Sequence, residues 1–470
     1  MDVKNKGMMK PRLLGLLLLA GVGSTQAVAQ TAVPDSMVTT VQSGPLTLKD
    51  ALNYALKASQ AARIARLDVE NAQYQIDEVK SRAMPQITGN ASLNYNPILQ
   101  LSALPGELAG QPGKTLMVAF GQKWSSGAGI SLSQNLFDKG VFTGLKAAKS
   151  TQEYYRINAQ LTDEQLIEQV ATTYYDVMVQ RQKVGVIDTT IYNAVKIQNV
   201  LKGQFENGLA KQIDLDRVAV NISNMRAQRQ QLLNAITLME NQLKYAMGLS
   251  IQTPITMPEF DYTSIQTQAV PAGDVLDATN RTEIKLLKQQ EVLLNFQKEA
   301  YKAEYFPTLS LNGNYAYQGL GNKLPWFQPG SAGVNWFDYA SAGLSLRIPI
   351  FNGFATRSRI RQADVDIRKL QENISQTSLG LNLAYENAKT QINNSIIVLN
   401  TQAENVELAR KVYFNTQNNY NNGLASLTDL LDAENSMTEA QNNHSGALLA
   451  YRVAEIQLIK AQGNLKTLLN

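Results

Sequence analysis

The sequence predicts a mainly α-helical protein with a small transmembrane β part, four strands per chain and an internal duplication. First, no proline occurs from Gly113 to Thr253 or from Ile350 to Asn470. Because a proline inside a helix costs about 3 kcal/mol, such gaps permit very long helices. Second, four segments alternate between apolar and polar residues with the period of a β-strand. Third, the second half of the chain repeats the first at an offset of about 215 residues, which is too long for a solenoid repeat.

The N-terminus has the order of a secretory signal peptide. Four basic residues precede an apolar run from Leu13 to Val22, and the small-residue sequence Ala27-Val28-Ala29 then offers a cleavage site. The run is shorter than the ~20 apolar residues that span a bilayer, and a polar stretch follows it, which disfavours an anchor helix. We therefore expect residues 1–29 to be removed on export and residues 30–45 to form an extended N-terminal segment.

The composition removes most catalytic chemistry. The 470 residues include no cysteine and one histidine, which excludes disulfides, thiolate nucleophiles, histidine-rich metal sites and a lipid anchor on cysteine. The histidine, His444, falls in a polar stretch and is expected to be solvated. The net charge of +4, largely carried by the leader, is too weak to indicate nucleic-acid binding. No glycine-rich phosphate loop is present, so we expect no enzyme activity, no cofactor and no metal.

The repeat gives the two halves the same order of elements. Gln204 to Ala210 matches Asn419 to Ala425, and each half reads as a helix, a strand pair, a very long helix, a glycine-centred turn and a return helix. Repeat 1 is predicted at 46–249, with strands at about 86–97 and 124–137, a long helix at about 140–206 and a return helix at 211–248. An inter-repeat connection at 250–274 leads to repeat 2 at 275–465, with strands at about 308–318 and 339–349, a long helix at about 353–421, a return helix at 427–463 and a tail at 466–470.

Each predicted strand is apolar on one face and polar on the other, as Ile87, Leu93 and Tyr95 show in the first. A soluble sheet half-buried against helices would give the same alternation. Export of the chain favours a membrane barrel over a soluble sheet. The long loops at 98–123 and 319–338 favour it too, because they contain aromatic residues of the kind that lie at membrane–water interfaces. Four strands cannot close a barrel, so several chains must contribute to it. The tryptophans in or beside the loops are Trp124, Trp326 and Trp336.

The long helices carry a coiled-coil pattern. A strict seven-residue apolar repeat keeps one stripe of a helix facing its partner. A helix of about 65 residues would extend roughly 100 Å. The stripe of the second long helix consists of Tyr385, Ile392, Leu399, Val406, Tyr413 and Tyr420.

This combination, with a Gly-Leu-Ala turn at matching places in both repeats, resembles the TolC family of outer-membrane efflux proteins over nearly all of residues 46–465. The resemblance implies a homotrimer whose chains form one outer-membrane β-barrel continued by a periplasmic α-helical barrel, a coiled-coil tunnel. It also implies an exit duct of a tripartite efflux or secretion system. Such a duct lies in outer-membrane lipid of a Gram-negative cell and works with a periplasmic adaptor and an inner-membrane pump of the resistance-nodulation-division or ABC class. The alternative is an exported coiled-coil scaffold without a channel, which would have no use for four amphipathic strands.

The two glycine-centred turns resemble the periplasmic tips of that family, where adaptor proteins dock. An ordinary turn between antiparallel helices also accounts for each glycine, which fits a left-handed helix cap. Repetition of the apolar residue after each glycine favours docking. The implied docking residues are Gly208, Leu209, Ala210, Gly423, Leu424 and Ala425.

The resemblance further implies an entrance gate. In the family, acidic residues six and nine positions after the second glycine surround the periplasmic entrance, and here these are Asp429 and Asp432. Asp214 has the matching offset in repeat 1, and Tyr420 corresponds to a tyrosine that joins such an acidic residue and holds the entrance shut. The family has a basic residue where this chain has Ala425, so fewer polar ties are expected here.

Two structural explanations compete with the gate. Ser426 and Asp429 have the spacing of a helix capping box, and Asp214 stands at the same point of its helix. Tyr420 lies on the heptad stripe, where core packing alone would account for it.

Overall fold

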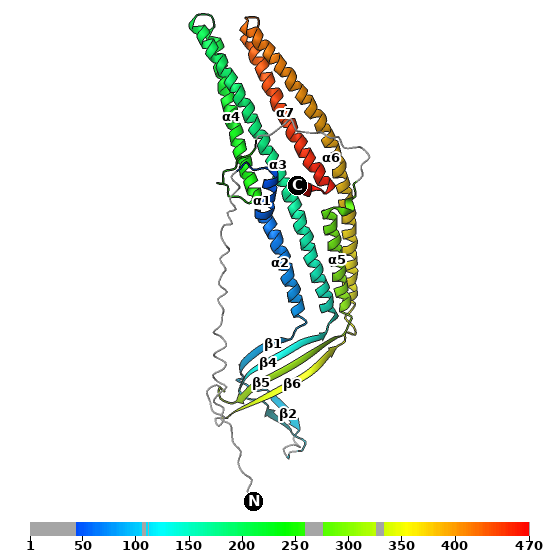
Figure 1. Cartoon of the computed structure of the whole chain (residues 1–470). Helices are drawn as coiled ribbons and strands as arrows, with labels where there is room; N and C mark the ends of the chain where they lie inside the picture. Colours follow the sequence, from blue (N-terminus) through cyan, green and yellow to red (C-terminus); the bar gives the residue numbers. More distant parts are fainter. Residues whose placement is uncertain (1–43, 106–109, 111, 259–275, 326–332, 470) are drawn as a thin grey trace. The chain divides into compact units, whose positions relative to one another are not determined.

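The computed structural model describes residues 44–105, 110, 112–258, 276–325 and 333–469 (Figure 1). The elements discussed here belong to one compact unit, Thr47–Asn470. The signal peptide, nearly all of the extended N-terminal segment, Trp326 and much of the inter-repeat connection lie outside the described residues.

Most of the chain is helical, and the two halves contain corresponding elements. The first half contains α1 (Leu48–Ala58), α2 (Gln60–Ser81), β1 (Gln86–Tyr95), β2 (Leu101–Pro105), β3 (Thr115–Ala119), β4 (Trp124–Phe137), α3 (Lys139–Glu206) and α4 (Gln212–Met247). The second contains η2 (Ala278–Asn280), α5 (Thr282–Ala303), β5 (Thr308–Gly321), β6 (Val334–Arg347), α6 (Ala355–Asn421), α7 (Leu427–Gln462) and η4 (Leu465–Leu469). Helix lengths match closely: α2 and α5 have 22 residues each, α3 and α6 have 68 and 67, and α4 and α7 have 36 each.

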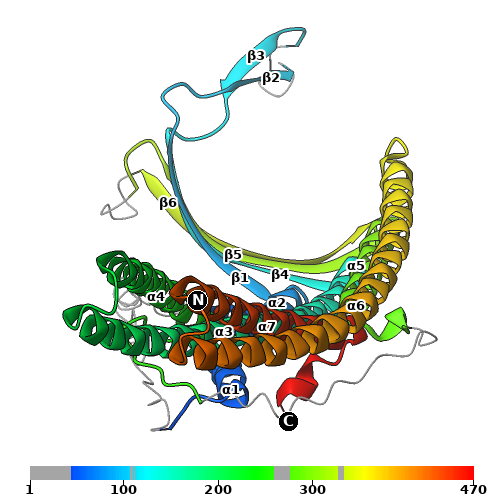
Figure 2. The same ribbon diagram turned by 90° about the horizontal axis from the view of Figure 1, so that it is seen from above.

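The four alternating segments form one antiparallel sheet in the order β1-β4-β5-β6. Its register aligns Ile87 with Leu132, Leu132 with Gly313 and Gly313 with Ala342, so the apolar positions of all four strands share one face. Figure 2 shows the strands as a single curved layer. Among the described elements, no helix packs extensively against either face of this sheet.

Two expectations about the strand-connecting segments were wrong. The stretch at 98–123, expected as a loop, contains the hairpin β2–β3, whose two strands have only five residues each among glycines and prolines. Strand β6 begins at Val334, earlier than expected, because pairing with Gly321 of β5 extends it. Trp336 therefore lies inside a strand and stacks on Tyr317 with ring centroids 5.0 Å apart.

The helices pack in pairs along their apolar stripes. α3 contacts α2 and α4, α6 contacts α5 and α7, and α3 also contacts α7 and α5. The heptad pattern in α6 is confirmed, since Tyr385, Ile392, Leu399 and Tyr413 are all buried. None of the described helices is both long and apolar enough to cross a lipid bilayer.

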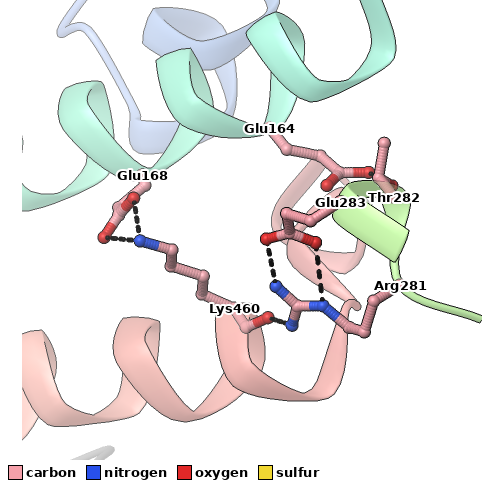
Figure 3. Close-up of polar contacts among 6 residues, drawn as sticks. All are labelled: Glu164, Glu168, Arg281, Thr282, Glu283 and Lys460. Carbon is pink, nitrogen blue, oxygen red and sulfur yellow. Dashed lines mark hydrogen bonds and ion pairs between the residues drawn. The ribbon is translucent and has the colours of Figure 1, made fainter. Parts of the chain in front are cut away.

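A polar junction holds the start of α5, the end of α7 and the middle of α3 together (Figure 3). Arg281, 4% exposed, donates to the Glu283 carboxylate at 2.6 and 3.2 Å and to the main-chain oxygen of Lys460. The Lys460 ammonium lies 2.8 Å from Glu168 of α3. Burial opposes ionisation of Glu283, but hydrogen bonds, notably from Arg281, outweigh it and lower its pKa. Thr282 donates to Glu164 at 2.7 Å, which adds a second tie to α3.

Gly248 ends α4 in the left-handed conformation, with φ of 76°, directly against the bend between α1 and α2. A Cβ at this position would lie 2.6 Å from the Ala58 carbonyl oxygen and 2.9 Å from the Ser59 Cα atom. Both the backbone conformation and the close approach therefore require glycine.

We predict that Gly248→Ala lowers the free energy of unfolding by about 2–4 kcal/mol, from the left-handed backbone and the clash together. Gly185→Ala is the matched control, because Gly185 lies inside α3 with no atom within 4 Å of the added Cβ. That change is expected to stabilise the protein by about 0.5–1 kcal/mol through helix propensity. Urea unfolding of the detergent-solubilised protein measures both, and equal effects would contradict the role given to Gly248.

Candidate functional site

The candidate site consists of the two hairpin tips, defined as residues 207–211 between α3 and α4 and residues 422–426 between α6 and α7 (Figure 1). In the first tip, Gly208 has φ of 74°, its amide donates to the Phe205 oxygen at 2.9 Å, and the Leu209 amide donates to the Gln204 oxygen at 2.8 Å. This pair of bonds defines a Schellman motif. The second tip repeats the motif at 3.0 and 2.8 Å, with Gly423, Tyr420, Leu424 and Asn419 in the same roles.

The leucine of each tip projects into solvent, with Leu209 80% and Leu424 78% exposed. A Schellman motif usually packs its final apolar residue on a side chain of the last helical turn. Here that turn offers the polar residues Gln204 and Asn419 instead. The sequence therefore leaves both leucines without an intramolecular partner surface, while Ala210 packs against the buried cluster beneath the first tip.

The two return helices begin differently. Ser426 caps α7: its hydroxyl donates to Asp429 at 2.7 Å, and the Asp429 amide donates back to that hydroxyl at 3.2 Å. The hydrogen bonds from Ser426 lower the pKa of Asp429. At the start of α4, Lys211 holds the capping position without a side-chain hydrogen bond. The capping explanation thus accounts for the conformation of Asp429 and leaves Asp214 available for other contacts.

Tyr420 and Asp214 lie near one another across the two hairpins. Tyr420 is half-buried, and its pKa is raised by burial and by the negative charge of Asp214. Within the described part of the chain, no hydrogen bond joins the two side chains. Tyr420 also packs on the buried cluster, so the packing explanation holds together with the electrostatic one. Asp432 is exposed on α7, one turn beyond Asp429, and takes part in neither contact.

A buried seam joins the hairpins below the tips. Arg217 of α4 donates to the Thr428 hydroxyl of α7 at 3.2 Å, and the hydroxyls of Thr190 and Thr438 lie 3.1 Å apart between α3 and α7. The apolar residues of this seam, here called the seam cluster, come from all four helices. They are Ile187, Ala194, Ile197, Leu201, Val218, Ile222, Met225, Tyr413, Leu427, Leu430 and Ala433.

Sequence reasoning missed one buried acid beside this seam and was wrong about the exposure of His444, which lies further along α7. Glu434 is 3% exposed, and neither of its carboxylate oxygens has a hydrogen-bond partner among the described residues. Burial raises the pKa of Glu434 to about 7. The available signal was its place beside Ala433 and one turn after Leu430, on an apolar stripe. His444 is half-buried, so the expectation of a solvated residue was wrong, and burial lowers its pKa.

Within the described ranges, no group of three or more acidic or histidine side chains could hold a metal ion. The site presents two exposed leucines, acidic side chains in the first two turns of the return helices and a seam between the two hairpins.

The family model described as outer membrane efflux protein matches residues 51–249 and 279–464. The chain is 21% identical over 341 residues to outer membrane protein TolC of Vibrio cholerae, a match covering 72% of this chain and 76% of that protein. It is 23% identical over 457 residues to the solvent efflux pump outer membrane protein SrpC of Pseudomonas putida, covering 94% and 90%. The solved structure of outer membrane protein VceC from Vibrio cholerae matches with a TM-score of 0.66 at 16% identity, over 88% of this chain and 96% of VceC. The structural likeness shows a shared fold.

Proposed function

The chain belongs to the outer membrane efflux protein family, and on that premise we propose that it is the outer-membrane exit duct of a tripartite efflux or secretion system. It conducts substrates passively from a periplasmic pump assembly to the outside and leaves substrate choice to the inner-membrane pump. The observation that carries this proposal is the sheet. Its apolar row is exposed, with Ile87 at 70%, Ile130 at 56% and Leu344 at 67%, and no described helix covers it extensively. A soluble scaffold would bury such a face, whereas lipid would cover it in a barrel.

The open edges of the sheet support an assembly of chains. β1 and β6 each have one unpaired side, and four strands are too few to close a barrel. We take the assembly to be a homotrimer in outer-membrane lipid, with repeats 46–249 and 275–465 each supplying two barrel strands and a set of tunnel helices. Residues 1–29 direct export and are removed, and the mature chain carries no lipid.

The proposed gate lies at the hairpin tips. Three copies of Asp429 and Asp432 surround the entrance and attract cations, and the charge of Asp214 acts on the Tyr420 hydroxyl to help hold the hairpins together. Two observations support this gate: Asp432 is exposed, and the negative charge of Asp214 contributes to the raised pKa of Tyr420.

We predict that purified protein forms channels in planar bilayers and that Asp429→Asn/Asp432→Asn reduces their cation selectivity, because the carboxylates near the entrance are lost. The reversal potential in asymmetric potassium chloride measures this. Asp366→Asn/Glu372→Gln, which removes two exposed charges from α6, is the control and should leave selectivity unchanged. Absence of any conductance would favour the scaffold alternative. Unchanged selectivity in the tip variant would assign Asp429 to helix capping alone.

Tyr420→Phe should raise the resting conductance, because it removes the hydroxyl on which the Asp214 charge acts and keeps the ring packed against the seam cluster. Single-channel open probability measures this, and unfolding by urea should be little changed. If Tyr420→Phe has the same open probability as the wild type, the hydroxyl has no part in the gate and Tyr420 contributes only packing.

Leu209→Arg/Leu424→Arg should abolish crosslinking to the adaptor and export, because a charged side chain replaces each exposed apolar point. Leu209→Met/Leu424→Met is the matched control, since it keeps apolar side chains of similar size and should retain crosslinking. Both pairs should assemble normally, as the leucines are exposed. If the arginine variant still crosslinks fully to the adaptor, Leu209 and Leu424 are not docking residues.

A further inference from the structure

Glu434 is a buried acid beside the seam cluster. It lies on α7, is 3% exposed, and both carboxylate oxygens lack a hydrogen bond within the described part of the chain. An ionised carboxylate in such a position is strongly disfavoured, and the group keeps a proton instead. The gate described above does not use this residue.

The position of Glu434 ties it to the contact between the hairpins. Its neighbours Leu430 and Ala433 belong to the seam cluster, which α3, α4, α6 and α7 build together. One turn further on, the Thr438 hydroxyl donates to the Glu434 main-chain oxygen at 2.9 Å and lies 3.1 Å from the Thr190 hydroxyl of α3. Because Leu430 belongs to the seam cluster and Thr438 contacts α3, we expect a movement that separates α3 from α7 to open the surroundings of Glu434 to water.

Among the residues that the structure describes, no charged group forms a salt bridge with Glu434. On α6, the titratable group that it influences is Tyr413, whose pKa is raised by burial and by the Glu434 charge. For Glu434 itself, burial alone raises the pKa to about 7. Several charged residues of these helices are engaged elsewhere or exposed: Asp188 pairs with Arg229, Lys196 lies over Tyr192, Arg410 pairs with Glu407, and Lys411, Asp432 and Glu439 are exposed.

We propose that Glu434 is a proton-operated switch of the hairpin seam, protonated while the hairpins are packed together and ionised once they separate. This inference rests on the proposed function, since it gives the gate a dependence on periplasmic pH. Separation of the hairpins releases a proton from Glu434 to water, and closure takes one up.

The direction of the pH dependence follows from the two pKa values. The packed state holds the proton up to about pH 7, whereas an exposed glutamate loses it near pH 4.5. The packed state is therefore favoured at low pH and loses this advantage as the pH rises from about 4.5 to about 7. Between pH 5.5 and pH 8 the equilibrium should shift toward separation by roughly 25-fold.

The absence of cysteine allows a direct measurement of separation. Spin labels on Glu206→Cys and Asn421→Cys, matching positions at the exposed ends of α3 and α6, report the distance between the hairpins in the full-length protein. We expect the distance distribution from pulsed electron resonance to shift toward longer values at pH 8 relative to pH 5.5. In Glu434→Gln, which is neutral and of similar shape, the short distances should persist at pH 8.

Two further variants complete the experiment. Glu439→Gln removes an exposed acid from the same helix and should keep the wild-type pH response. Glu434→Met, which fills the buried site without a polar group, should behave as Glu434→Gln does. A wild-type distribution that ignores pH, or a Glu434→Gln response equal to wild type, would overturn the switch. Channel recordings of the same proteins separate the proposals: hairpin motion without conductance contradicts the duct, and conductance without hairpin motion contradicts the switch.

Discussion

Each long helix is longer than any helix that packs along it, and much of the architecture follows from this mismatch. The apolar stripe of α3 runs through a helix of 68 residues, but its partners α2 and α4 have 22 and 36. Two shorter helices must therefore follow one another along the long one, and α5 and α7 do the same along α6. Where the shorter helices meet, unsatisfied helix ends come together and have to be sealed.

The two halves seal this point by different means. In the first, Gly248 allows the end of α4 to approach the main chain at Ala58 directly. In the second, the buried Arg281 reaches the last turn of α7 with its guanidinium group. A buried cation destabilises a protein unless it is paired, and Glu283 supplies the pairing charge. Because Lys460 and Thr282 also bind carboxylates of α3, this junction fixes the second half to the first.

The sequence was sufficient for the long helices and for the apolar faces of the strands, because both signals are local and repeated. Proline-free tracts and a seven-residue stripe extend over many turns, and alternation places every second residue of a strand on one face. The register that pairs Ile87 with Leu132 was not predictable, because a slip of two residues would keep the same face. The hairpin β2–β3 escaped prediction because strands of five residues contain too few positions to show alternation among turn residues. The apolar stripe of Leu430 and Ala433 was a local signal for the burial of Glu434, but the surroundings of its carboxylate depend on which helices lie opposite. The burial of His444 depends on such contacts too, and the polar residues around it in the sequence carry no information about them. The engagement of Arg281 with the end of α7 is likewise a contact between distant segments.

The tips show the same difference between local motifs, which the sequence reveals, and contacts between distant segments, which it does not. The two turns are nearly identical, and their glycine motifs have the same hydrogen bonds, so the duplication preserved the turn itself. The helix starts that follow have diverged. Ser426 and Asp429 form a capping box at the start of α7, whereas Lys211 at the start of α4 makes no side-chain hydrogen bond, so Asp214 has no capping partner. One aspartate thus fixes the start of α7, while its counterpart acts electrostatically on Tyr420 of the other hairpin. Asp429 and Asp214 occupy matching positions of the two repeats but differ in role. Asp429 caps its own helix, and Asp214 acts on the other hairpin, so only the interaction of Asp214 depends on the distance between the hairpins. Glu434 differs from both aspartates, because it is buried beside the seam cluster and neither of its carboxylate oxygens has a hydrogen-bond partner among the described residues.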